Sequence, residues 1–160
     1  MRNIYNKGIT LLEIIIVIAV ISILVSVIIP SMAKFKSEQA LKNTTEEIVS
    51  LLNKAKLDSN SFLDASIYSV YFTTDRAVYF KGASYSPSNP TNQVVLLNSS
   101  VEIPSSGGIN LTNPINANTI TFPQLTEDVR GYGTIIIRMT SDASRQKIIS
   151  INRLGSIGSN

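Results

Sequence analysis

The chain has 160 residues, a formal net charge of +3, no histidine and no cysteine. Without these two residue types it cannot form a Ser-His-Asp or Cys-His catalytic site, a zinc site with His or Cys ligands, or a disulfide. We therefore expect a non-enzymatic protein that holds no cofactor and no metal and is stabilised by packing alone. Its length allows one modest domain.

The first predicted element is an apolar helix. The 21 residues from Ile9 to Ile29 are enough, at about 1.5 Å per residue, to cross a hydrocarbon core of roughly 30 Å. Thirteen residues between Ile14 and Ile29 are Ile, Leu or Val, and together they outweigh a penalty of about 3 kcal/mol for one acidic group, Glu13. We expect this segment to enter a membrane at some stage.

A short basic leader precedes the helix. Arg2 and Lys7 carry its charges, and Gly8 ends it. In a secretory signal peptide the small residue at the cleavage site follows the apolar region, whereas Gly8 comes before it. Cleavage after Gly8 would keep the helix on the mature protein and free an α-amino group on Ile9, four residues before Glu13.

This arrangement of leader, Gly8, apolar helix and Glu13 resembles the prepilin leader of the type IV pilin family. The resemblance implies that a prepilin peptidase cuts after Gly8 and methylates the new amine of Ile9, a position where the family usually has Phe. It implies three further partners: an inner-membrane assembly platform, other pilins or pseudopilins in a helical filament, and membrane lipid before assembly. It also implies a single-pass protein of the cytoplasmic (inner) membrane, with its N-terminus cytoplasmic and its head extracytoplasmic, that later enters a pilus or pseudopilus.

Glu13 and Pro30 are the candidate assembly residues. An unpaired carboxylate in an apolar filament core would cost several kcal/mol, so Glu13 needs a cation, which by the resemblance is the Ile9 amine of a neighbouring subunit. The alternatives are its own Ile9 amine, about 6 Å along the same helix, or no role, because the helix dipole favours an acid in the first turns. Pro30 either bends the helix by removing one backbone hydrogen bond or marks its exit from the membrane.

Beyond Pro30 the helix is predicted to continue as an amphipathic segment and to end in the polar cluster 58–61. Glu38 and Lys42 are spaced for a favourable i, i+4 ion pair. The residues expected on the buried stripe are Leu41, Thr45, Ile48, Leu52 and Ala55.

The remaining residues predict strands separated by loops rich in Pro, Gly, Ser and Asn. Thr74-Asp75 is expected to form the turn of a hairpin, and the segments 82–92 and 104–118 are expected to be loops. One antiparallel sheet packed on the amphipathic stripe is the economical architecture. The predicted strands are 67–73, 76–81, 94–97, 101–103, 119–122, 134–139 and 147–151.

The predicted fold class is α+β: a long N-terminal α-helix, transmembrane in its first half and amphipathic in its second, packed on an antiparallel β-sheet head, as in the pilin fold. The expected parts are a prepilin leader (1–8), a transmembrane or filament-core helix (9–30), the amphipathic half of the helix (31–61) and a β-rich globular head (62–160).

The order of strand motifs in the head is similar to that of the GspH/FimT-like minor pseudopilins. The resemblance rests on 120–123, 133–137 and 149–151, followed by Gly155 and Ile157. Those proteins typically have an Arg after the glycine of the last turn, and this chain has Ser there. The subunit is therefore expected to be a minor pilin or pseudopilin of a type IV pilus or type II secretion pseudopilus.

Two other functions remain open. Loss of the leader leaves 12 basic and 11 acidic side chains, a net charge of +1, but several cations lie near the C-terminus, and some FimT-like minor pilins bind DNA during uptake. Phosphate binding needs such cations to converge on one face. The other alternative is a membrane-tethered binding module that does not polymerise. The candidate nucleic-acid contacts are Arg138, Arg145, Lys147 and Arg153.

Overall fold

A computed structural model describes residues 9–124 and 128–160, without the side chains of residues 27–31 and 33. The chain forms two units, one ending at Lys36 and the other spanning Ser37–Asn160. Helix α1 (Leu11–Asn60) begins in the first unit and ends in the second. Its end in the polar cluster 58–61 confirms the predicted end of the helix. Its backbone continues through Pro30, whose side chain lies outside the description.

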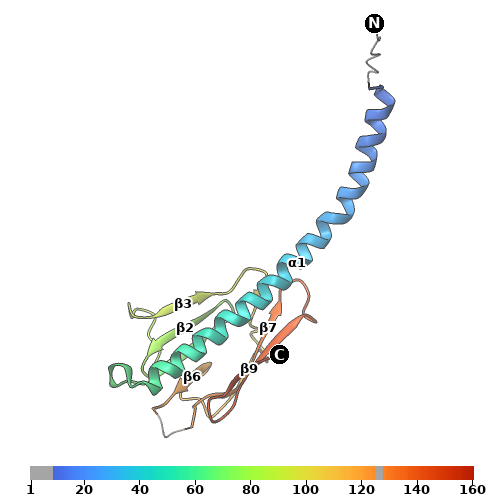
Figure 1. Cartoon of the computed structure of the whole chain (residues 1–160). Helices are drawn as coiled ribbons and strands as arrows, with labels where there is room; N and C mark the ends of the chain where they lie inside the picture. The colour runs from blue at the N-terminus through green and yellow to red at the C-terminus, as the bar shows by residue number, and fades with distance from the viewer. Residues whose placement is uncertain (1–8, 125–127) are drawn as a thin grey trace. The chain divides into compact units, whose positions relative to one another are not determined.

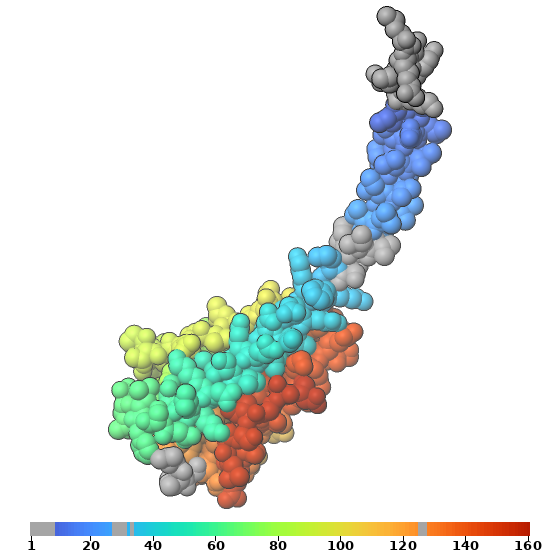
Figure 2. All heavy atoms as spheres, in the orientation of Figure 1, coloured from blue at the N-terminus to red at the C-terminus, as the bar shows by residue number. Residues whose placement is uncertain are grey.

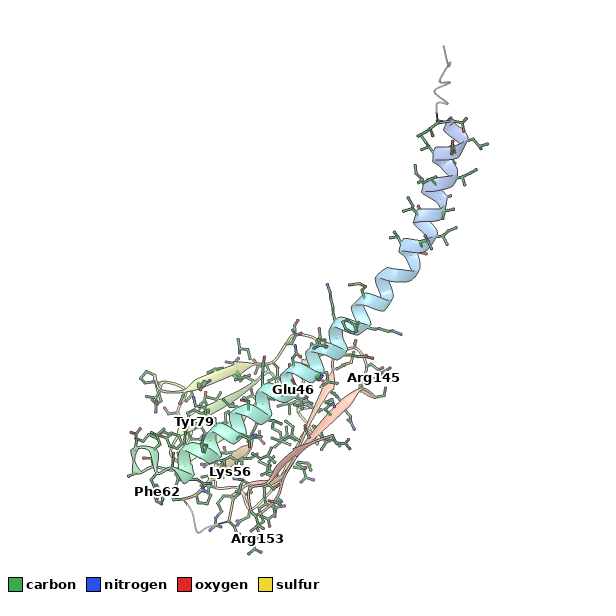
Figure 3. The ribbon with its side chains drawn as sticks, viewed as in Figure 1. Glu46, Lys56, Phe62, Tyr79, Arg145 and Arg153 are labelled. Atoms are coloured by element: carbon green, nitrogen blue, oxygen red, sulfur yellow. The ribbon has the colours of Figure 1, made fainter. Side chains whose placement is uncertain are left out.

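The first unit presents apolar side chains to its surroundings on every side. All described side chains from residue 9 to residue 26 are exposed, and Figure 3 shows them pointing outward around the helix. A helix that is apolar all round is stable only when something covers it. The described part of the chain contains no helix with the length and apolar character that a bilayer crossing requires; the predicted span, 9–30, extends into residues whose side chains lie outside the description.

Two serines interrupt the apolar surface without leaving a hydroxyl unpaired. The Ser22 hydroxyl donates to the carbonyl oxygen of Ile18 at 2.8 Å, and the Ser26 hydroxyl donates to that of Ile23 at 2.7 Å. Such bonds to the preceding turn satisfy a hydroxyl within its own helix. Both serines can therefore enter apolar surroundings at little cost.

In the second unit, α1 packs on the head through the predicted stripe. All five stripe residues are buried, with Ile48, Leu52 and Ala55 fully inaccessible. The Thr45 hydroxyl donates to the Leu41 carbonyl at 2.7 Å, so this buried polar group is satisfied. Leu51 is also buried and widens the stripe beyond the prediction.

A four-stranded antiparallel sheet covers one side of this helical segment. Its strand order is β3-β2-β1-β6, and the predicted hairpin at Thr74-Asp75 joins β1 and β2. The short 3-10 helix η1 (Leu63–Ala65) lies between α1 and β1. The strands are β1 (Tyr68–Phe72), β2 (Arg76–Lys81), β3 (Gln93–Leu96) and β6 (Thr119–Phe122).

A second antiparallel sheet, of five strands, corrects the expectation of a single sheet. Its order is β4-β7-β8-β9, with β5 also paired to β7. The sequence analysis missed β5 and β9, and it placed β5 inside a loop. Both are short, and each is paired to a longer strand, β5 to β7 and β9 to β8. The strands are β4 (Val101–Glu102), β5 (Ile109–Thr112), β7 (Tyr132–Met139), β8 (Gln146–Ile151) and β9 (Ile157–Ser159).

The two sheets and the stripe of α1 share one hydrophobic core. In Figure 1 this part of α1 lies across the strands, with β2 and β3 on one side of it and β7 and β9 on the other. Figure 2 shows the same helical surface between the yellow residues around β3 and the red C-terminal residues. The architecture is α+β, a helix packed on antiparallel sheets, and is consistent with the pilin fold.

The predicted Glu38–Lys42 pair is replaced by other ion pairs. Glu38 contacts Arg145 at 2.8 Å, and Lys42 lies 4.0 Å from Glu46. Arg145 comes from the turn between β7 and β8, so its approach to Glu38 depends on the tertiary fold, which helical spacing does not indicate.

Candidate functional site

Thr10 caps the N-terminus of α1, directly before the helix begins at Leu11. The Glu13 amide lies 3.2 Å from the Thr10 hydroxyl oxygen and 3.1 Å from the Thr10 carbonyl oxygen. A threonine followed three residues later by glutamate is the signature of a capping box. Sequence reasoning missed this cap, although the Thr10-x-x-Glu13 spacing was available to find it.

The cap fixes where Glu13 lies. It is in the first turn of α1, where the partial positive charge of the helix end stabilises a carboxylate by roughly 0.3–1 kcal/mol. Within the described residues its carboxylate contacts no cation. The predicted processing residue Gly8 and the leader charges Arg2 and Lys7 lie outside the described residues, so the geometry of cleavage is not part of this structure.

Around Glu13 the helix offers a continuous aliphatic surface. Ile9, Leu12 and Ile16 are exposed by 73%, 67% and 55%, and burying one such side chain contributes about 1.5–3 kcal/mol. Bringing this surface against lipid or other helices is therefore strongly favourable. The carboxylate of Glu13 is then the group that must find a partner.

At its other end, α1 is tied to the head by one buried serine. Ser59 is completely inaccessible; its hydroxyl donates to the Phe122 carbonyl at 2.7 Å and accepts from the Tyr68 amide at 2.7 Å. One side chain thus joins the last turn of α1 to both β1 and β6.

A half-buried polar cluster joins α1 to β2 and β3. The Tyr79 hydroxyl donates to Asp58 at 2.7 Å, and the Tyr79 ring stacks on Tyr68 with centroids 5.3 Å apart. Burial, assisted by the Asp58 carboxylate, raises the pKa of Tyr79. The Lys54 ammonium lies 4.8 Å from the Tyr79 ring centroid and donates to Gln93 at 2.6 Å. The polar groups of this cluster are each other's partners, and their contacts fix the helix on the sheet.

The candidate nucleic-acid residues do not form a common basic surface. Arg138 contacts Glu102 at 2.7 Å, Arg145 contacts Glu38 at 2.8 Å, and Arg153 contacts Asp128 at 2.7 Å, so three of the four predicted cations face carboxylates. Lys147 lies on β8. Figure 3 places Arg145 and Arg153 at opposite ends of the head. The described geometry therefore gives no support to binding of a phosphate backbone.

The described residues also offer no obvious enzyme site. A cavity of about 300 Å³ opens beside the β1–β2 turn, and its lining has hydroxyl and amide groups but no ionisable side chain. No group of three or more acidic residues that could hold a metal ion occurs within 9–124 and 128–160. The cavity is lined by Phe72, Thr73, Thr74, Ile103, Pro104, Ser105, Ile109 and Asn118.

Comparison with known proteins matches only the N-terminal part of the chain. Residues 4–29 match the family model described as the prokaryotic N-terminal methylation motif. No curated protein and no solved structure matches the chain. The chain therefore carries the prepilin leader of type IV pilin-like proteins, as the sequence predicted, whereas the subtype of its head stays a prediction.

This motif has direct consequences for processing and location. It implies cleavage by a prepilin peptidase, assembly of the pilin kind and anchoring in a membrane. Proteins with this leader are typically structural subunits of a pilus or a secretion machine rather than enzymes. Membrane anchoring and assembly with other helices both agree with the exposed aliphatic surface of the first unit.

Proposed function

We propose that this chain is a minor pilin or pseudopilin, a structural subunit of a type IV pilus or a type II secretion pseudopilus. The observation that carries the proposal is the all-round apolar helix surface over residues 9–26, which lies within the methylation motif at residues 4–29. Such a surface needs lipid before assembly and neighbouring helices afterwards.

In this proposal the chain has four functional parts. Residues 1–8 are removed after Gly8, residues 9–30 span the cytoplasmic membrane and later enter the filament core, residues 31–61 support the head, and residues 62–160 form it. The partners are the prepilin peptidase, the assembly platform in the inner membrane and sibling subunits.

Glu13 sets the axial register of the subunit. Its carboxylate meets the methylated Ile9 amine of a neighbour once the helices pack together. A wrong stagger would leave a buried charge without its partner, which costs several kcal/mol. The capped first turn supports this role, because Thr10 holds the backbone of Glu13 four residues from the new N-terminus at Ile9.

The experiment that tests the proposal compares Glu13→Ala with Glu47→Ala, an exposed acid further along the same helix. Each variant is expressed in cells with the intact machine, and its amount is measured in membranes and in sheared filaments. We expect Glu13→Ala to remain in membranes but to be absent from filaments, while Glu47→Ala assembles normally. Normal incorporation of Glu13→Ala would refute the role of Glu13.

A further inference from the structure

Directly after the apolar segment, two lysines flank an aromatic ring. Lys34 and Lys36 are the first charged residues after Glu13, and Phe35 lies between them. All three side chains are exposed, and Phe35 is exposed by 65% and Met32 by 52%. Because residues three apart share one side of a helix, Met32 and Phe35 form a small apolar patch beside two ammonium groups.

These two charges have no carboxylate partner among the described residues. Glu38, the nearest acid in the sequence, contacts Arg145 at 2.8 Å. The next one, Glu46, lies 4.0 Å from Lys42. The positive charge of Lys34 and Lys36 is therefore not neutralised by ion pairs within the described chain, and both ammonium groups are available to an anion outside it.

The position of this group along the helix indicates the kind of anion. The apolar segment extends almost to Lys34, so a helix inserted through that segment places its next turn near the phosphate layer of a bilayer. Lysine stems lie along apolar surface while their ammonium groups reach phosphates. Each basic residue near an anionic lipid surface strengthens binding to that surface roughly fivefold. An exposed ring between two lysines suits this boundary, since its apolar face can lie among the upper acyl chains.

We propose that Lys34, Phe35 and Lys36 bind the anionic phospholipid headgroups of the bilayer that receives the apolar segment. The inference rests on the proposed function, because it requires insertion of that segment. The contact holds the helix at a fixed depth before assembly, and it has to break when the subunit leaves the bilayer for a filament.

The absence of tryptophan from the chain gives a direct test. Full-length Phe35→Trp protein carries a single tryptophan and is reconstituted into vesicles that contain phosphatidylglycerol and phosphatidylcholine. In one set the bromine quencher is on phosphatidylglycerol and in the other on phosphatidylcholine, at equal total bromine. The ratio of quenching in the two sets reports which lipid surrounds position 35.

We expect stronger quenching by brominated phosphatidylglycerol, and loss of that preference when Lys34→Gln and Lys36→Gln are added to Phe35→Trp. The matched control, Lys42→Gln with Lys81→Gln, removes two charges from exposed ion pairs of the second unit and should keep the preference. High salt should reduce the preference in the unsubstituted background. Equal quenching by the two lipids, or a preference that survives loss of both lysines, would overturn the inference.

Insertion is measured in the same vesicles by resistance to alkaline carbonate extraction. Protein that stays inserted without preferring phosphatidylglycerol would overturn the headgroup contact and leave the proposed function standing. Protein that carbonate removes would overturn both.

Discussion

Replacing Ser59 by Ala tests how the helix is joined to the head. Ser59 is fully buried, and its hydroxyl bonds both the Phe122 carbonyl and the Tyr68 amide at 2.7 Å. The substitution leaves one buried acceptor and one buried donor without partners. At about 1–3 kcal/mol for each of these two unsatisfied groups, we expect the free energy of unfolding to fall by about 2–6 kcal/mol.

Urea unfolding of residues 37–160 measures this loss, because Ser37–Asn160 forms a compact unit that contains the described hydrophobic core. With an m-value of about 2 kcal/mol per molar urea, the midpoint should fall by about 1–3 M. Ser61→Ala is the matched control: Ser61 is exposed, and its hydroxyl donates only to the Asp58 carbonyl at 3.2 Å. If Ser59→Ala and Ser61→Ala shift the midpoint equally little, Ser59 does not join α1 to β1 and β6.

Two other predictions concern the strands. A Cβ atom on Gly133, which has φ +152°, would overlap the Asn110 carbonyl oxygen on β5, whereas Gly82, with φ +100°, has open space around it. Gly133→Ala should therefore lower the urea midpoint clearly more than Gly82→Ala. Equal effects of the two substitutions would contradict the close approach of β5 and β7. Two hydrogen bonds, the larger effect coming from Arg76 and the smaller from Thr73, lower the pKa of Asp75 from 3.8 to about 2. A depressed pKa contributes stability that is present above pH 4 and is lost as the pH falls towards 2. An NMR titration of the Asp75 carboxyl group should give this low pKa and should return it towards 3.8 in Arg76→Gln; a normal pKa in the unsubstituted protein would contradict the contact.

Local patterns predicted the helix and its buried face well. The stripe from Leu41 to Ala55 follows from helical periodicity, which needs only neighbouring residues, and the hairpin at Thr74-Asp75 follows from two strands close in sequence. The capping box at Thr10 is equally local, and its sequence signature was overlooked.

Long-range pairing could not be predicted in the same way. β5 and β9 are only four and three residues long and lie among Gly, Asn and Ser, so their local pattern is too short to predict a strand without β7 and β8. The division into two sheets depends on β6 pairing with β1, across the 46 intervening residues 73–118 of varied character. Glu38 likewise found a partner, Arg145, that only the folded head brings near it.

The candidate site was only partly predictable. The leader and Glu13 follow from spacing in the sequence, because processing depends on a linear motif. The ion pairs of Arg138, Arg145 and Arg153 depend on which carboxylates the fold places beside them, so a count of basic residues near the C-terminus overstated the free positive charge.

Mass spectrometry of the mature N-terminus tests the central claim most directly. The protein is purified from cells that produce it with an active prepilin peptidase. The account predicts a chain that begins at Ile9 and carries one added methyl group on its α-amine. A native chain that still begins at Met1 and retains Gly8, or one cut at any other residue, would contradict it.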